Sequence, residues 1–198
     1  LYQLVFPVYA LGISFSCAGT ELALSRCVAQ ENAAGHPEKA KELLKTGLIF
    51  TFVLSCILTI FLQHNAHMTA ISFLHDSRCE KLLILLSYTF PFASIHSCIC
   101  GYSLGLKQTK IPAVSQLFEQ TFRILFVFLF CYYRTSHQLD LSISFAVVGL
   151  AMGEIFASCY CLYSIHHTAS KQVQNLLSAS TFCIHLSRLF RHAFPLTA

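Results

Sequence analysis

The stretch IPAVSQLFEQTFRILFVFLF, residues 111–130, combines the length of a membrane-spanning helix with a set of strongly polar side chains. A bilayer core about 30 Å thick needs a helix of about 20 mostly apolar residues. At 100° per residue, the polar side chains fall within an arc of about 100°, while the apolar ones point elsewhere. They are Gln116, Glu119, Gln120 and Arg123. The stretch therefore predicts a membrane helix with one polar face.

The composition of the whole chain supports this prediction. Of the 198 residues, 55% are hydrophobic and 11% are charged. An ordinary soluble domain carries roughly twice that charged fraction. The apolar runs are continuous, whereas the strands of a membrane β-barrel alternate between apolar and polar residues. We therefore expect an all-α fold, a polytopic transmembrane helix bundle.

Five apolar runs predict five spans within one transmembrane lobe, residues 1–191. The spans cover residues 4–29, 43–62, 82–106, 112–133 and 141–165. Pro91 predicts a kink in the third span, because proline frees a backbone carbonyl that neighbouring helices must satisfy. The mixed pattern of residues 170–191 predicts an amphipathic helix at the membrane interface. Residues 192–198 predict the start of a further, truncated span.

Lys and Arg residues gather on one predicted side of the membrane. Of the 13 in the chain, only Arg78, Lys81 and Arg134 belong to the other side. Cytoplasmic loops carry an excess of these residues. The connector between the first two spans is therefore expected to be cytoplasmic.

Arg123 is predicted to lie deep in the membrane. A rise of about 1.5 Å per residue puts it roughly 16 Å beyond Pro112, near the bilayer centre. A charge there costs at least about 2.5 kcal/mol unless it meets a partner or water. Glu119, four residues earlier, is the expected partner. The working hypothesis is that this polar face lines a hydrophilic cavity where Arg123 attracts an anionic headgroup; the alternative is polar contact between buried helices.

Three further charged residues are candidates for the same cavity. Arg26 either extends to the cytoplasmic surface, which is its expected role, or takes part in binding. Glu21 either faces the cavity or pairs across helices. Glu154 follows Gly149 and Gly153, a pattern that permits close helix approach, and it serves either the cavity or the packing.

Cysteine and histidine are abundant, at ten residues each. Most of the cysteines lie in apolar runs, where cysteine behaves as a small hydrophobe. The Cys-x-Cys pairs at 98–100 and 159–161 lack the CxxC spacing of a zinc site. His96, the histidine deep within a span, is expected to pack. We therefore expect no metal site and no cofactor.

Three motifs of common enzyme classes are absent from the sequence. There is no GxxxxGK phosphate-binding loop, no HExxH and no evident Ser/His/Asp arrangement. The chain is therefore expected to have no catalytic residues and not to be an enzyme, and no nucleic acid is expected among its partners.

Residues 101–123, GYSLGLKQTKIPAVSQLFEQTFR, resemble a segment of the stage V sporulation protein B and oligosaccharide flippase group. That group belongs to the multidrug/oligosaccharidyl-lipid/polysaccharide flippase superfamily. The matching positions are Gly101, Tyr102, Gly105, Leu106, Pro112, Ser115, Gln116, Glu119, Gln120 and Arg123. Residues 1–40 are similar to the second helix of the group and its connector, and residues 190–198 to the start of the seventh.

The resemblance implies part of the N-terminal lobe of a flippase-type transporter that works by alternating access. The first helix, the rest of the seventh and the second lobe would be missing. The implied partners are a lipid-linked glycan, the lipid bilayer and the missing lobe. A cavity-lining role is implied for the polar face of residues 116–123 and, more weakly, for Arg26. Glu21 departs from the pattern, which has an uncharged residue there.

Three functional hypotheses follow. The first is a transporter fragment that flips or exports a lipid-linked oligosaccharide or polysaccharide precursor across the bacterial cytoplasmic membrane. The second is a cation-coupled multidrug antiporter of the same superfamily, in which Glu21, Glu119 or Glu154 binds H⁺ or Na⁺. The third is a non-transporting membrane scaffold or a degenerate fragment.

Overall fold

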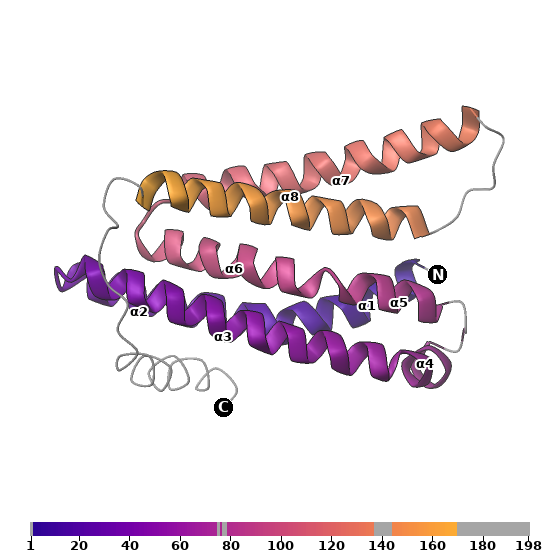
Figure 1. Ribbon diagram of the computed structural model, residues 1–198, viewed down its shortest axis with the longest axis horizontal. Coiled ribbons are helices and arrows are strands. Elements are labelled where there is room, and N and C mark those ends of the chain that lie inside the picture. Colours follow the sequence, from indigo (N-terminus) through magenta and orange to yellow (C-terminus); the bar gives the residue numbers. More distant parts are fainter. Residues whose placement is uncertain (1, 75, 77–78, 137–143, 170–198) are drawn as a thin grey trace.

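The chain forms helices throughout the part that the structure describes, and no strand occurs there (Figure 1). This computed structural model describes residues 2–74, 76, 79–136 and 144–169. The elements are α1 (Tyr2–Ile13), the π-helix η1 (Ser14–Ala18), α2 (Gly19–Ala33), α3 (Pro37–His64), α4 (Ala66–Met68), the π-helix η2 (Thr69–Phe73), α5 (Cys79–Ser87), α6 (Phe90–Gly105), α7 (Lys110–Ser136) and α8 (Ser144–Ala169). The prediction of an all-α fold is confirmed.

Long apolar helices dominate the fold. Among the described residues, four helical stretches are long and apolar enough to cross a membrane, or five if the bent pair α5–α6 is one span. Large apolar side chains point outward, such as Phe15 with 75% and Phe128 with 68% of its surface exposed. Soluble proteins rarely expose large contiguous apolar patches. The outer surface therefore suits lipid, and the prediction of a polytopic membrane bundle is confirmed.

The helices around the first connector are longer than the predicted spans. α2 ends at Ala33 and α3 begins at Pro37, where the fixed φ of proline suits a first helical turn. Gly35 has a φ of 77°, and the His36 N–H donates to the Glu31 carbonyl at 3.0 Å. The left-handed conformation of Gly35 turns the chain so that the N–H of the next residue can satisfy a carbonyl at the end of α2, which ends the helix.

Other predicted boundaries shift or fall outside the described residues. α7 begins at Lys110, before Pro112, and continues to Ser136. α8 begins at Ser144, whereas residues 141–143 of the fifth predicted span are not described. The interfacial helix predicted at 170–191 and the span predicted from 192 also lie outside the described residues.

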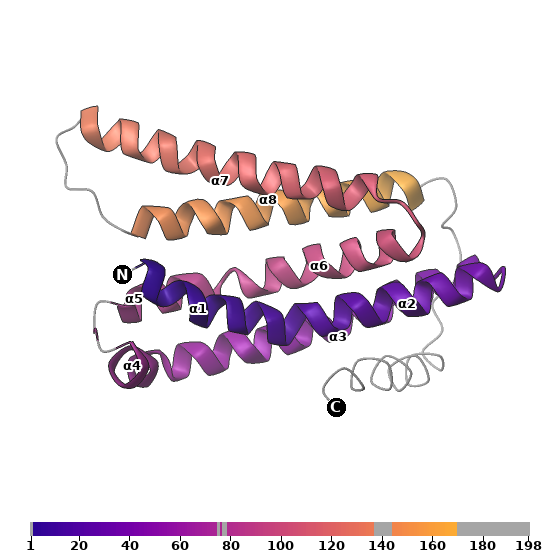
Figure 2. The same cartoon turned by 180° about the vertical axis from the view of Figure 1, so that it is seen from behind.

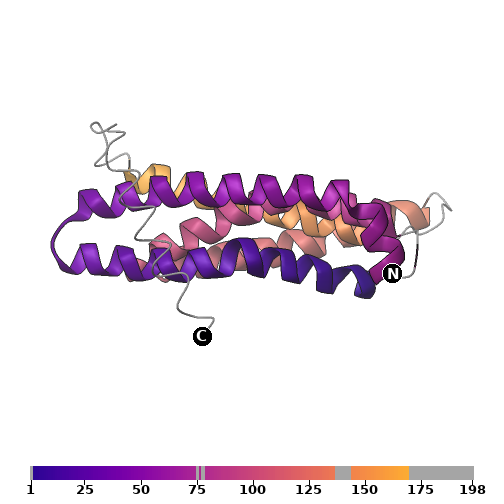
Figure 3. The same cartoon turned by 90° about the horizontal axis from the view of Figure 1, so that it is seen from below.

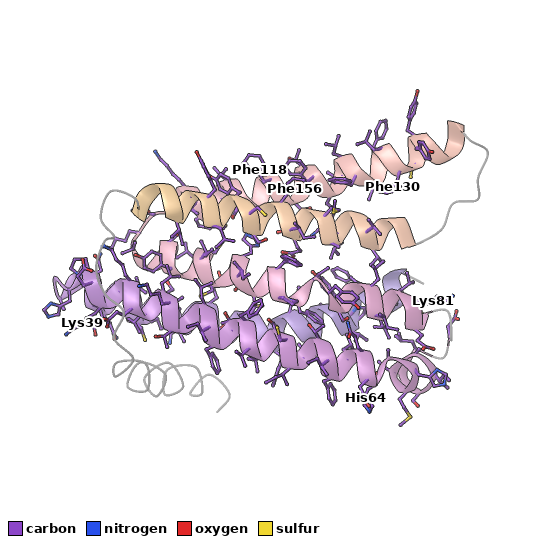
Figure 4. The ribbon with its side chains drawn as sticks, viewed as in Figure 1. Lys39, His64, Lys81, Phe118, Phe130 and Phe156 are labelled. Carbon is purple, nitrogen blue, oxygen red and sulfur yellow. The ribbon has the colours of Figure 1, made fainter. Side chains whose placement is uncertain are left out.

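α6 lies at the centre of the bundle, between the α2–α3 hairpin and the α7–α8 pair (Figures 1 and 2). Figure 3 shows α1 and α2, end to end, running beside α3 along the length of the molecule. Lys39 lies at one end of the bundle, while His64 and Lys81 lie at the other (Figure 4). The two ends correspond to the two predicted sides of the membrane.

α5 and α6 are bent by 43° where they meet. Pro91 has no N–H, so it cannot bond to the Ser87 carbonyl one turn earlier. The Thr59 hydroxyl of α3 shares its proton between this carbonyl at 3.1 Å and the Ser55 carbonyl of its own helix at 2.8 Å, and the Gln63 amide donates to the Ser87 hydroxyl at 3.0 Å. The kink predicted from Pro91 is confirmed, and the neighbouring helix satisfies the carbonyl that the proline leaves unpaired.

α7 and α8 approach closely at two glycines. A Cβ atom at Gly153 would lie 2.8 Å from the Glu119 carbonyl oxygen. A Cβ atom at Gly149 would lie 2.6 Å from Cγ2 of Val127. Beside them, Phe156 of α8 stacks on Phe122 of α7 with ring centroids 4.2 Å apart, and Figure 4 labels Phe156 at this contact. The predicted packing role of the two glycines is confirmed.

Replacing Thr59 with Val should destabilise the bundle by about 1–2 kcal/mol, because the Ser87 carbonyl then lacks a donor in an apolar setting. Thr51→Val is the matched control. Thr51 is also buried on α3, and its hydroxyl donates to the Gly47 carbonyl of its own helix at 2.9 Å, as that of Thr59 does to the Ser55 carbonyl at 2.8 Å, but the contact with the Ser87 carbonyl belongs to Thr59. Unfolding in mixed detergent micelles measures both variants. Equal losses would contradict the assigned role of Thr59.

Replacing Gly153 with Ala should destabilise the α7–α8 contact by about 1–3 kcal/mol, because the added methyl group forces the helices apart. Gly19→Ala is the control, since a Cβ atom at Gly19 meets nothing within 4 Å. That variant should be neutral or stabilised by up to about 1 kcal/mol. Thermal unfolding in detergent tests the pair, and a stable Gly153→Ala variant would refute the close approach.

Candidate functional site

Ionisable side chains from four helices meet inside the bundle. α1 contributes Tyr9, α6 contributes His96, α7 contributes Glu119 and Arg123, and α8 contributes Glu154. We call these five residues the polar cluster. Ligand atoms of His96, Glu119 and Glu154 all lie within 4.8 Å of one another. Residues from widely separated parts of the sequence therefore form one site.

Arg123 lies midway along α7, about 20 Å from either helix end at 1.5 Å per residue. Its guanidinium donates to the Glu119 carboxylate one turn earlier and to Oε1 of Gln120 at 3.4 Å. Within the described residues, its Nε atom is buried and has no hydrogen-bond partner. The side chain is 27% exposed. Arg123 therefore keeps donor capacity after pairing with Glu119.

Glu154 is buried, and its two carboxylate oxygens differ in their contacts. Oε1 accepts a hydrogen bond from the Tyr9 hydroxyl at 3.4 Å. Oε2 lies 3.6 Å from Nδ1 of His96, beyond hydrogen-bond distance. In the described part of the chain Oε2 has no hydrogen-bond partner. A buried carboxylate with one free oxygen is costly, so the site has capacity for a proton or a cation.

His96 connects Glu154 with α7. Its Nε2 atom lies 3.0 Å from the Ser115 hydroxyl, while Nδ1 faces Glu154. The sequence predicted a packing role for His96 and no role for Tyr9. A histidine deep within a predicted span was the one available signal; for Tyr9 there was none, because apolar membrane helices commonly contain tyrosine.

The charges of the polar cluster do not cancel when His96 is neutral. Arg123 carries one positive charge at any physiological pH, and Glu119 and Glu154 carry two negative charges when ionised. A net charge in an apolar interior is unfavourable. One proton or one monovalent cation would make the cluster neutral.

The predicted polar face of α7 divides into two parts. Glu119 and Arg123 belong to the polar cluster, and Gln120 touches it through Arg123. The side chains of Gln116 and Gln120 are exposed on the outside of α7. Only part of the polar face predicted from the sequence therefore turns toward the polar cluster.

Two other candidate residues lie apart from the polar cluster. Glu21 accepts a hydrogen bond from the Ser97 hydroxyl of α6 at 2.8 Å, so it pairs across helices, which is one of the two alternatives left by the sequence. A Cβ atom at Gly101 would lie 2.7 Å from the Glu21 carbonyl oxygen, which shows how closely α2 and α6 pack. Arg26 is exposed on α2, and the structure does not bring it to the polar cluster.

Comparison with known proteins gives two relatives. Stage V sporulation protein B of Bacillus subtilis (strain 168) is 28% identical over 160 residues, which cover 81% of this chain and 31% of that relative. Lipid II flippase MurJ of the same organism is 27% identical over 135 residues, which cover 64% of this chain and 25% of that relative. The matched region thus spans less than a third of either relative. No solved structure matches the chain.

A family model covers the whole chain. The model of the polysaccharide biosynthesis protein family matches residues 1–198. The resemblance noted at residues 101–123 is thereby confirmed. This multi-pass membrane protein belongs to the polysaccharide biosynthesis protein family.

Proposed function

We propose that this chain is part of a flippase-type transporter that moves a lipid-linked oligosaccharide or polysaccharide precursor across the membrane by alternating access. The observation that carries the proposal is Arg123, a partly exposed cation at the middle of a spanning helix, on its polar face. Ionisable groups at such a depth are functional candidates by default. The family and the name of one relative, a lipid II flippase, support a lipid-linked substrate.

Arg123 is the group that recognises the charged part of the substrate. A lipid-linked sugar joins an apolar tail to a phosphate or diphosphate group. A guanidinium binds phosphate oxygens through paired, charge-assisted hydrogen bonds. Glu119 holds the guanidinium on one side, and 27% of the Arg123 side chain is exposed. Arg123 is thus positioned before the substrate arrives, which lowers the entropic cost of binding.

Gln116 and Gln120 extend this site along α7. Both side chains are exposed on the helix that carries Arg123. Amide groups donate and accept hydrogen bonds, so they suit sugar hydroxyls and water but not lipid tails. In the whole transporter, this face of α7 lines a cavity that is shared with a second lobe.

The α7–α8 pair is the part that would move relative to the rest. Within the described residues, its contacts with the other helices run mainly through α6 and α5. Secondary transporters commonly alternate access by rocking one group of helices against another. Glu154 lies at this contact, between Tyr9 of α1 and His96 of α6. A change in its charge would therefore bias the arrangement of the two groups.

A cation-coupled antiporter is the second candidate function. The observation that favours it is the group His96, Glu119 and Glu154, whose ligand atoms lie within 4.8 Å of one another. H⁺ or Na⁺ bound there would neutralise the excess negative charge. Loss of the protein should cause accumulation of lipid-linked precursor if it is a flippase, and increased sensitivity to drugs if it is a multidrug antiporter. A membrane scaffold would show neither effect.

Cysteines introduced at Gln116 and Gln120 should react with a membrane-impermeant maleimide, because these positions face water in the proposed cavity. Cysteines at Leu117 and Ile124 are the matched controls. Their side chains are 68% and 67% exposed, but they should face lipid and remain unlabelled. Labelling is measured in membranes, with the protein that carries only the native cysteines as background. Equal protection of all four positions would contradict a water-filled cavity along α7.

Replacing Arg123 with Gln should weaken binding of a fluorescent polyprenyl-diphosphate-linked sugar by about 10–100-fold, the equivalent of one charged hydrogen-bonding group. Arg123→Lys should retain part of the affinity, since the charge remains but the paired geometry is lost. Lys110→Gln, on the same helix but at its end, controls for loss of charge. The protein is assayed in nanodiscs, and unchanged binding by Arg123→Gln would exclude Arg123 from substrate recognition.

A further inference from the structure

Two thiols and one imidazole converge between α6 and α8. Cys100 and His96 come from α6 and Cys161 from α8. Their sulfur and nitrogen ligand atoms all lie within 4.8 Å of one another. We propose that these three residues bind a thiophilic divalent metal ion, with Zn²⁺ as the main candidate.

Each of the two Cys-x-Cys pairs contributes one ligand. Side chains two residues apart on a helix are separated by about 200° of rotation about the helix axis. Only one member of each pair can therefore face the other helix. Cys98 packs in the apolar cluster with α2 and α3, and Cys159 is exposed. Cys100 and Cys161 are both buried. The sequence spacing within each pair therefore did not reveal a site that forms between helices.

The donor set fits the coordination chemistry of Zn²⁺. Zinc takes thiolate sulfur at about 2.3 Å and imidazole nitrogen at about 2.0–2.1 Å, in tetrahedral geometry. These bond lengths place neighbouring ligand atoms about 3.5–3.8 Å apart, so small rotations of the thiols close the site. The Ser115 hydroxyl lies 3.6 Å from Sγ of Cys100 and 3.0 Å from Nε2 of His96. It is placed to hydrogen-bond a water in the fourth coordination position.

Charge balance favours a divalent, thiophilic ion over other cations. Binding releases one proton from each thiol, so Zn²⁺ and two thiolates form a neutral unit. A neutral unit avoids the cost of a net charge in a buried site. Hard cations such as Na⁺ and Mg²⁺ prefer oxygen ligands, and two of the three ligands here are sulfur.

Glu154 supports this site from the other side of the imidazole. When Nε2 of His96 binds a metal ion, Nδ1 carries the proton. Nδ1 lies 3.6 Å from Oε2 of Glu154, the oxygen without a hydrogen-bond partner in the described residues. A carboxylate that accepts from the second ring nitrogen orients a metal-bound histidine and increases its basicity. The metal ion would thus fix α6 to α8 next to the polar cluster.

Titration of the purified full chain with Co²⁺ and then Zn²⁺ tests the proposal, with the thiols kept reduced by a phosphine. We expect one equivalent of Co²⁺ to give a thiolate-to-cobalt charge-transfer band that Zn²⁺ abolishes. The double variant Cys100→Ser/Cys161→Ser should lose the band and at least about 100-fold in Zn²⁺ affinity, since even indirect supporting residues contribute 10–100-fold. Cys98→Ser/Cys159→Ser removes as many thiols from the same helices and should retain both properties.

Two further measurements remain informative if a variant folds poorly. Glu154→Gln should weaken Zn²⁺ binding by about 10–100-fold. In the wild-type protein, Zn²⁺ should slow alkylation of Cys100 and Cys161, measured by mass spectrometry, but not that of Cys98 or Cys159. The proposal is overturned if the two double variants bind Zn²⁺ equally or if the wild type gives no charge-transfer band. None of these assays requires transport, so they test the metal site independently of the proposed function.

Discussion

A cationic side chain in the middle of an apolar helix must be neutralised, and the arrangement around α7 follows from this constraint. Arg123 cannot lose its proton, and at the bilayer centre an unpaired charge costs at least about 2.5 kcal/mol. Glu119 provides one local partner. Gly153 has no Cβ atom and therefore lets α8 approach closely, since a Cβ atom there would lie 2.8 Å from the Glu119 carbonyl oxygen. The next residue of α8 is Glu154. The close approach of α8 to α7 therefore also brings a second carboxylate, Glu154, into the polar cluster.

The other helix contacts obey a related rule. In lipid there is no hydrophobic driving force for helices to associate, so small and weakly polar residues mark the contacts. On α3, the Ser55 hydroxyl lies 3.1 Å from that of Ser94 on α6, and Thr59 satisfies the carbonyl freed by Pro91. Large apolar residues such as Phe15 point outward instead. The surface of this bundle is thus more apolar than that of a soluble protein, while its interior combines apolar clusters with polar contacts between helices.

Patterns along single helices could be predicted from the sequence, whereas contacts between helices could not. Composition and hydrophobic periodicity predicted the all-α membrane bundle, and Pro91 predicted the bend. The pairing of Glu119 with Arg123 followed from their spacing of four residues. The roles of His96 and Tyr9 depend on how each helix is rotated about its axis and on the crossing of α6 with α8. The same reason explains why Glu21 and Glu154 were equivalent candidates by sequence, although only Glu154 reaches the polar cluster.

His96 belongs to both sites, so the protonated and the metal-bound states of its imidazole exclude one another. A protonated imidazole neutralises the polar cluster, because it balances the second carboxylate, but it has no lone pair left to bind a metal ion. When His96 binds the metal ion, its imidazole is neutral. Zn²⁺ with two thiolates is neutral as well, so the metal site adds no charge to the polar cluster. Glu119, Glu154 and Arg123 then keep one net negative charge, which a proton or cation elsewhere in the cluster must balance. In the proposed transporter, Zn²⁺ would therefore both fix α6 to α8 and keep His96 uncharged, so metal binding is expected to oppose any motion that depends on a charge on His96.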